Sequence, residues 1–348
     1  MEHFENGFSL TLTGASHAPE VGFALCGIPA GEKVDLDLVK RDIIRRSAAS
    51  FENATPRREA DGFTVVSGIA GGVTTGETIR FTFENRAYDR SEYRPVARPS
   101  HADLCAFVRS GGTEDISGGG RYSGRMTLPL VAAGGVCRQI LARRGMEVFA
   151  HVAAIGELRD APFDPMMEQK PVMDELFPLV SPSKRKWMEE LISVTRAAGD
   201  TLSSEAECAV LGAPVGLGEP LFGGVEATLS KYLFAIPGLR TAEFAERRPL
   251  GSDMNDQFTE GGRTKTNNSR GINGGMANGM PIIFRAWFRP VPSISLPQTG
   301  FDLIEKKPVP LTITGRHDTA ILPRGLVAVE AAACLAMLEM LYEYDKRN

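Results

Sequence analysis

The sequence lacks the features of a secreted or disulfide-bonded protein. Its N-terminus, MEHFENGFSL, has no basic segment followed by an apolar core, so we expect no secretory signal. The cysteines are odd in number and show no C-x-x-C spacing, which is typical of reduced thiols that serve as small core residues. They are Cys26, Cys105, Cys137, Cys208 and Cys334. These absences together predict a cytoplasmic protein.

The sequence also lacks an uninterrupted apolar run of membrane-spanning length. The most apolar late stretch, LVAVEAAACLAMLEMLYEY, carries Glu330 and Glu339, whose charges would be costly at a bilayer centre. We interpret it as a buried helix and expect no membrane association.

The chain has no excess of positive charge. Its 39 lysines and arginines face 43 aspartates and glutamates, giving a net charge of -4. This balance excludes whole-protein attraction to nucleic acid or acidic membranes. An anionic ligand would therefore need a local cluster of basic side chains.

Common motifs of nucleotide and metal enzymes are absent as well. No G-x-x-x-x-G-K-[ST] or H-E-x-x-H occurs, and GLGEPLFGG lacks the G-x-G-x-x-G spacing. His101, Asp103 and Cys105 are residue types that bind zinc, and Cys105 and His101 are types that form a nucleophilic pair, but no second spacing signature accompanies them. We therefore predict no metal site.

The pattern of apolar residues predicts an α+β protein. Short alternating or apolar runs predict strands at 8–12, 63–69, 78–84, 147–155, 206–212 and 282–288. Helices are expected from the cap Asp35 to Arg46, from Thr127 to a stop at Gly145, between Ser183 and Gly199, and from about Pro323. Strands and helices do not alternate as βαβ units would.

The length of 348 residues allows one large domain or two average ones. GIPAG (27–31) and GAPVG (212–216) each follow an apolar run and precede a helix-like segment. A pseudo-symmetric single domain would produce this echo, and so would two unrelated turns. Residues 156–182 are polar and proline-rich, and we expect them to form an exposed excursion.

Three stretches combine glycine, serine, histidine and arginine at the junctions of predicted elements. GASH (14–17) follows a strand, while RPSHAD to SGGGRYSGRMT (98–127) and GRHD (315–318) precede helices. Glycine-rich backbone lets N–H groups approach a ligand, and a helix N-terminus adds unpaired donors. Four arginines could bind carboxylate or phosphate there: Arg98, Arg121, Arg125 and Arg316.

Each of these residues alone has a simpler explanation. An arginine in such a loop is most often a solvated or salt-bridged surface residue, and His17 or His101 alone is most often structural. Asp318 alone is most simply a helix cap or a partner of Arg316. The recurrence of the pattern favours an anion site but identifies no reaction.

Taken in order, these motifs resemble the chorismate synthase family. The resemblance covers nearly the whole chain, through GASH, CGIPAG, SGIAGGVTTGETI, RPSHAD, SGGGRYSGRMT, GLGEPLF, NNSRGINGGMANGMPI, RPVPSI, GRHD and PRGLVAVEA. It implies one α+β domain over residues 1–348, with helices in a core between antiparallel sheets. It also implies a homotetramer.

The reaction implied by the resemblance is an anti-1,4-elimination. 5-Enolpyruvylshikimate 3-phosphate loses phosphate and a ring hydrogen to give chorismate, with reduced FMN as cofactor and no net oxidation. No part of the chain resembles a flavin reductase, so the family implies a separate source of reduced flavin, with NADPH as the indirect reductant. The two carboxylates and the phosphate of the substrate match the expected cluster of arginines.

The resemblance also assigns roles to individual residues. His17 would donate a proton to the departing phosphate, and His101 would stabilise or protonate the reduced flavin. Asp318 would relay the proton from flavin N5, and Arg316 would keep it ionised. Substrate contacts are implied for Ser16, Arg46, Arg98, Ser123, Arg125 and Arg316. Flavin contacts are implied for Asn267, Asn268, Arg289, Pro290 and Ser293.

The sequence departs from the family pattern at several positions. The usual G-E-S-H-G reads GASHA, and Glu52 stands where an arginine that contacts substrate is usual. Arg270 replaces a glycine, and Arg289 replaces a lysine. Arg270 or Arg57 would have to compensate for Glu52. Two alternatives therefore stay open: a catalytically impaired ligand-binding or regulatory homologue, and a lyase acting on another phosphorylated cyclic acid.

Overall fold

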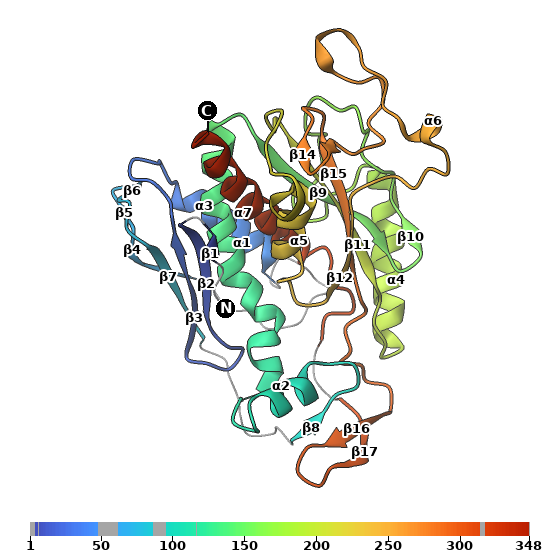
Figure 1. Cartoon of the computed structure of the whole chain (residues 1–348). Coiled ribbons are helices and arrows are strands. Elements are labelled where there is room, and N and C mark those ends of the chain that lie inside the picture. The colour runs from blue at the N-terminus through green and yellow to red at the C-terminus, as the bar shows by residue number, and fades with distance from the viewer. Residues whose placement is uncertain are drawn as a thin grey trace.

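The computed structural model describes residues 4–5, 7–47, 62–85, 95–115, 117–313 and 317–347. Two five-stranded antiparallel sheets form the outer layers, and a group of helices fills the space between them (Figure 1). Apolar side chains of both sheets and of the intervening helices form one continuous core. The α+β prediction, with helices between antiparallel sheets, is confirmed.

The first sheet has the strand order β1-β2-β3-β7-β4. Ile79, Phe81 and Phe83 point inward along β7 and are fully buried, as the alternating pattern predicts. The strands are β1 (Phe4–Glu5), β2 (Phe8–Gly14), β3 (Glu20–Cys26), β4 (Thr64–Ser67) and β7 (Ile79–Glu84), and a small hairpin of β5 (Ile69–Ala70) and β6 (Val73–Thr74) follows β4.

The second sheet has the order β10-β9-β11-β15-β12. Its strands are β9 (Glu147–Ile155), β10 (Leu158–Arg159), β11 (Ser204–Leu211), β12 (Leu239–Glu243) and β15 (Ile282–Phe288).

The prediction that residues 156–182 form an exposed excursion is wrong for two aromatic residues. Phe163 and Phe177 are buried, and Phe163 packs against Phe149 of β9. Two aromatic anchors in a polar segment are enough to hold it on the sheet.

All four predicted helices are present. They are α1 (Leu36–Arg46), α3 (Thr127–Arg143), α4 (Arg185–Ala197) and α7 (Leu326–Asp345). Asp35 caps α1 as predicted, because its carboxylate accepts a hydrogen bond of 2.8 Å from the Asp37 backbone N–H. Three further helices are α2 (Asp103–Arg109), α5 (Val225–Leu233) and α6 (Gly251–Met254). Within the described ranges, no helix combines the length and apolarity needed to cross a bilayer.

Helices α3 and α7 cross in direct backbone contact at the centre of the molecule. A Cβ atom added at Gly134 would lie only 2.4 Å from Cβ of Ala331. This close approach fixes α3 relative to the core. The N-terminal end of α3 then lies near α2 and a small sheet of β8 (Val96–Ala97), β16 (Gln298–Asp302) and β17 (Lys307–Leu311), at the lower end of Figure 1. The hairpin of β13 (Ile272–Asn273) and β14 (Met276–Ala277) lies at the upper end.

A buried ion cluster joins α1, α3 and α7. Glu330 of α7 is 1% exposed and accepts hydrogen bonds from Arg45 at 2.8 and 3.1 Å and from Arg138 at 2.7 Å. The backbone N–H of Ala150 in β9 donates a fourth. Burial alone would raise the pKa of Glu330, but the two arginines outweigh burial and lower the pKa to about 2. The glutamate that interrupts the apolar run is therefore a structural anion.

We expect Glu330→Gln to destabilise the protein by about 3–5 kcal/mol, because it removes the buried anion shared by two guanidinium groups and leaves them only Asp42. Urea unfolding at neutral pH measures this loss. The control is Glu343→Gln on the same helix, whose partner Lys346 is exposed. Its cost should stay below about 1 kcal/mol. Equal losses in the two variants would contradict the structural role of Glu330.

The same cluster predicts a pH dependence of the free energy of unfolding. The folded-state pKa of Glu330 is depressed to about 2, below the value of 4.5 for an unperturbed glutamate. Its contribution is therefore fully present above about pH 4.5 and is lost as the pH falls toward about 2. The wild type and Glu330→Gln should consequently converge in stability on acidification, and a constant difference down to about pH 2 would refute this.

Candidate active site

The stretches singled out in the sequence meet at the N-terminal end of α3. The turn between β2 and β3 contacts the glycine-rich loop, since the backbone N–H of Ser16 donates to the Gly120 carbonyl at 2.9 Å. That loop, Ser117–Tyr122, is not helical at its centre, because Gly118, Gly119 and Gly120 all have positive φ. Only glycine adopts this backbone readily, so the run of three glycines is required by the turn itself.

Ser16 and His17 lie directly against Gly118. A Cβ atom there would lie 2.0 Å from Cε1 of His17, 2.4 Å from its Nδ1 and 2.9 Å from Oγ of Ser16. Ser16 is buried and His17 is half-buried. The absence of a side chain at Gly118 is what admits the imidazole.

His101 lies against the next residue of the same loop. A Cβ atom at Gly119 would lie 3.3 Å from Cε1 and 3.4 Å from Nε2 of His101. Because consecutive Cα atoms are about 3.8 Å apart, His17 and His101 approach neighbouring points on one strip of backbone. The two histidines are therefore brought close together, although they are far apart in the sequence.

Asp103 holds Arg98 and His101 together. Its carboxylate accepts bonds from Nε and Nη2 of Arg98 at 2.8 and 2.9 Å, and Nδ1 of His101 lies 2.6 Å from Oδ1. The Asp103 side chain is only 4% exposed. Burial would raise the pKa of Asp103, but the hydrogen bonds from Arg98 and His101 outweigh it and hold the pKa well below its usual range.

This geometry fixes the proton on His101. A nitrogen 2.6 Å from a carboxylate oxygen needs a proton between them, so Nδ1 carries the hydrogen and Nε2 is left facing Gly119. Arg98 also lies 3.0 Å from Nδ1, but its Nη2 already donates to the same Oδ1. The working atom of His101 is therefore Nε2.

Three of the predicted substrate contacts line the start of α3. Arg46, at the end of α1, is 4% exposed and donates to Oγ1 of Thr127 and to the Gly124 carbonyl, at 2.9 and 3.1 Å. Arg125 is 8% exposed, and its backbone N–H donates to Oγ of Ser123 at 3.3 Å. Arg46, Ser123 and Arg125 are thus within one turn of the helix N-terminus, whose dipole also favours an anion.

Asp318 is tied to the same region through Arg324. Nη1 of Arg324 lies 2.6 Å from Oδ2 of Asp318, and its Nε donates to the Arg46 carbonyl at 3.1 Å. Arg316, which we expected to keep Asp318 ionised, lies outside the described residues. The cation that the structure places beside Asp318 is Arg324, which the sequence did not single out.

His317 was given no role, yet it also faces this cluster. Burial first and the nearby charge of Arg98 second lower the pKa of His317, which favours the neutral imidazole. Its buried Nε2 has no hydrogen-bond partner within the described residues.

The residues predicted to contact flavin separate into two groups. Ser293 and Arg289 join the site: Oγ of Ser293 accepts from Arg98 at 3.2 Å, and Nη1 of Arg289 donates to the Ser100 carbonyl at 2.6 Å. Pro290 follows Arg289, whose Nε donates to the Pro290 carbonyl. Burial and nearby Arg240 lower the pKa of Arg289.

Asn267 and Asn268 lie at the other end of β15. Asn267 is 2% exposed, and its amide bonds the carbonyls of Pro165 and Pro281 and the backbone N–H of Gly271. The seven residues of β15 span about 20 Å, so within one chain these asparagines are not brought to His101. Their contact with flavin stays a prediction.

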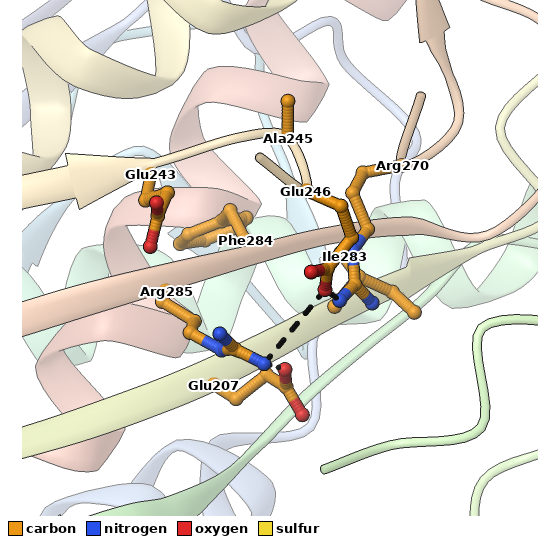
Figure 2. A pocket seen from close by; sticks show the side chains of 8 residues that line it. All are labelled: Glu207, Glu243, Ala245, Glu246, Arg270, Ile283, Phe284 and Arg285. Carbon is orange, nitrogen blue, oxygen red and sulfur yellow. Dashed lines mark hydrogen bonds and ion pairs between the residues drawn. The ribbon is translucent and has the colours of Figure 1, made fainter. Parts of the chain in front are cut away.

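Arg270 belongs to that distant end as well. Figure 2 shows it beside Glu246, with which it forms an ion pair, at a cavity of about 10 Å³ that also borders Glu207 and Arg285. Such a space has room for about one water molecule. Arg270 therefore lies away from Arg98 and His101, while Glu52 and Arg57, on which the predicted compensation also depends, lie outside the described residues. With φ +52, Arg270 also strains a position that suits glycine.

The departures in the GASHA turn are structurally mild. Gly14 has a positive φ, and none of residues 15–18 does. Ala18 in place of the usual glycine therefore costs no backbone strain.

Three residues of the site were not assigned to it from the sequence. Asp103 stands inside the RPSHAD motif, and its spacing of two residues from His101 was the available signal. Arg324 stands in the PRG segment, and Asn85 follows β7, where its side chain accepts a hydrogen bond of 3.0 Å from Nε of Arg125. No local sequence pattern marks Arg324 or Asn85, because both act through contacts with residues distant in the sequence.

Known proteins are similar to this chain over nearly its whole length. The family model for chorismate synthase matches residues 8–342. The chain belongs to the chorismate synthase family. The family's curated members include the chorismate synthase of Dehalococcoides mccartyi, 37% identical over 345 residues that cover 96% of this chain and 94% of the relative. The chorismate synthase of Aeropyrum pernix is 38% identical over 348 residues, covering 96% of this chain and 91% of the relative.

The fold of the family is also found among solved structures. A crystal structure of chorismate synthase superposes with a TM-score of 0.75 and covers 97% of this chain and 93% of its own, at 22% sequence identity. At that identity the likeness bears on fold alone, and it agrees with the two-sheet architecture. The family resemblance expected from the motifs is confirmed.

Proposed function

We propose that the protein catalyses the anti-1,4-elimination of phosphate from 5-enolpyruvylshikimate 3-phosphate, giving chorismate, and that it requires reduced FMN. The observation that carries this proposal is the convergence of His17 and His101 on consecutive glycines at the N-terminal end of α3. In the reaction the C–O bond to phosphate and a ring C–H bond break, a C=C bond forms, and phosphate and one proton leave. No electrons are lost or gained overall.

Among the described residues, five arginines lie around this convergence, which suits a substrate with two carboxylates and a phosphate. Arg98 is paired with Asp103 and Arg324 with Asp318, while the described contacts of Arg46, Arg125 and Arg289 go to neutral oxygens. The described contacts thus hold all five arginines in place around the site. An anion bound there would add charge-assisted hydrogen bonds.

His17 is the group we assign to protonate the departing phosphate. Its ring lies against Gly118 near the hydroxyl of Ser16, in a turn that Asn85 connects to Arg125 at the start of α3. A phosphate oxygen drawn to the helix N-terminus would therefore lie close to a proton donor, as general acid catalysis requires.

The residues next to His101 fit a flavin phosphate and ring. Arg289 supplies a cation, Ser293 a hydroxyl and Gly119 a backbone surface without a side chain, all connected to His101 through Arg98 and Ser100. The chemistry supplied by bound reduced FMN is electron donation as the C–O bond breaks and acceptance of the ring hydrogen at N5. Nε2 of His101 then serves to hold or deliver a proton beside the flavin, because Asp103 occupies Nδ1.

An anaerobic assay with reduced FMN and the enolpyruvyl substrate tests the proposal. We expect chorismate and phosphate to appear in equal amounts, without oxidation of the flavin. Binding of the substrate without release of phosphate would instead support the regulatory alternative. Turnover of a different phosphorylated cyclic acid in the same assay would support the second alternative.

Asp318→Asn should lower turnover by a factor of about 10²–10⁴, while the affinity for substrate stays within about threefold. The reason is that the amide keeps the shape of the carboxylate but cannot accept the proton to be relayed. Steady-state kinetics and calorimetric binding separate the two effects. Asp345→Asn, which removes an exposed ion pair with Arg144, is the control. Wild-type turnover in Asp318→Asn would remove this residue from the mechanism.

We further propose that the active form is a homotetramer. The exposed apolar side chains of Leu221, Phe222 and Phe258, at 84%, 96% and 77% exposure, support an association of this kind. Light scattering of the purified protein measures the mass of the assembly.

A further inference from the structure

We infer that Asn85 is a positioning residue, whose single side-chain amide sets the mutual placement of the Ser16–His17 turn and the Arg125 guanidinium. The catalytic consequence of this inference rests on the proposed function. The contacts of Asn85 from which it is argued do not depend on that function. Asn85 immediately follows β7 and is 5% exposed. It is thus a buried polar group, for which every hydrogen bond matters.

The donor side of the amide faces the turn. Nδ2 lies 2.8 Å from the Ala18 carbonyl and at the longer distances of 3.4 and 3.5 Å from the carbonyls of Ser16 and Ala15. The backbone N–H of Asn85 adds a bond of 2.9 Å to the Pro19 carbonyl. One residue therefore contacts the turn on both sides of His17.

The acceptor side faces Arg125. Oδ1 accepts from Nε at 3.0 Å, in a fully buried contact. The assignment of oxygen and nitrogen is decided by chemistry, because a guanidinium can only donate and carbonyls can only accept. The amide cannot be reversed without placing N–H against N–H and oxygen against oxygen.

No other residue type of this size satisfies both sides. Aspartate would still accept from Arg125, but its second oxygen would face the Ala18 carbonyl. Alanine would leave both Arg125 and the turn without this partner. The Asn85 side chain thus connects the β2–β3 turn that carries His17 to Arg125, the arginine at the start of α3 that we expect to bind substrate. These contacts join residues that are 67 and 40 positions apart in the sequence.

Asn85→Ala and Asn85→Asp test the inference, with Gln139→Ala as the matched control. Gln139 is also a buried amide, bonded to both backbone groups of Asp35 and to the Gly135 carbonyl, away from the site. All three variants should lose thermal stability. Only the Asn85 variants should also displace the His17 ring.

The first readout is the NMR signal of the His17 Cε1–H, assigned by its loss in His17→Asn. Since Cε1 lies against Gly118, we expect this signal to move in both Asn85 variants and to stay at the wild-type position in Gln139→Ala. The second readout is kcat, which should fall about tenfold or more in Asn85→Ala and stay within about twofold in Gln139→Ala. An unmoved His17 signal, or equal kcat in the two alanine variants, would overturn the inference.

These readouts also separate the proposed lyase function from the positioning role of Asn85. If the wild type releases no phosphate, the proposed function fails, but the His17 signal still decides the role of Asn85. If the wild type turns over and Asn85→Ala retains its kcat, the positioning role fails alone.

Discussion

Gly118→Ala is expected to lower turnover by a factor of about 10² or more while the protein stays folded. The added Cβ would lie 2.0 Å from Cε1 of His17 and 2.9 Å from Oγ of Ser16, so one of these side chains has to leave its place. The change also puts a side chain at φ +58, at a cost of about 1–2 kcal/mol. Steady-state kinetics and circular dichroism measure the two effects.

The matched control is Gly111→Ala. Gly111 also has positive φ, at +61, but a Cβ atom there meets nothing within 4 Å. The two variants share the backbone strain and differ in the clash with His17. We expect similar losses of stability and a loss of turnover in Gly118→Ala alone. Equal turnover would show that His17 does not depend on the glycine beside it.

Asp103→Asn should have the second large effect, a fall in kcat of about 10²–10³ together with a higher KM. The amide removes the anion that orients Nδ1 of His101, and it leaves Arg98 without its buried charge partner. Rates measured over a range of pH test this further. The depressed pKa of Asp103 keeps the carboxylate ionised above about pH 4, so acidification from about pH 8 to 5 should not reproduce the defect in the wild type.

Asp37→Asn is the control for that experiment, because Asp37 forms an exposed ion pair with Lys40. Its kinetic constants should match those of the wild type. Unchanged kcat in Asp103→Asn would mean that His101 keeps its orientation without the carboxylate.

The sequence predicted most of the fold because its signals were local. The alternating residues of β7 and the cap at Asp35 appear as expected. Strand β3 was missed because Gly22 interrupts its apolar pattern, although a Cβ there would lie 2.5 Å from the Phe81 carbonyl of the neighbouring strand. Helix α2 is too short, at seven residues, for its period to be read.

The site was predictable only in part, for a physical reason. Motifs identified His17, His101 and Asp318, but a motif does not say which atoms meet. The pairing of Asp318 with Arg324 and the bridge made by Asn85 depend on how distant strands and helices pack. Asn267 shows the reverse case, in which a motif assigned a role that the contacts do not display. Its motif predicted a flavin contact, but its side-chain amide is occupied by backbone groups at the far end of β15.

The close crossing of α3 and α7 has a consequence for ligand binding. Gly134 lies seven residues after Thr127, and its contact with Ala331 leaves no room for the helix to slide or rotate. The anion-binding end of α3 is therefore preorganised by the core. Little conformational entropy remains to be lost there when a polyanion arrives, so the free energy of its contacts appears more fully as affinity.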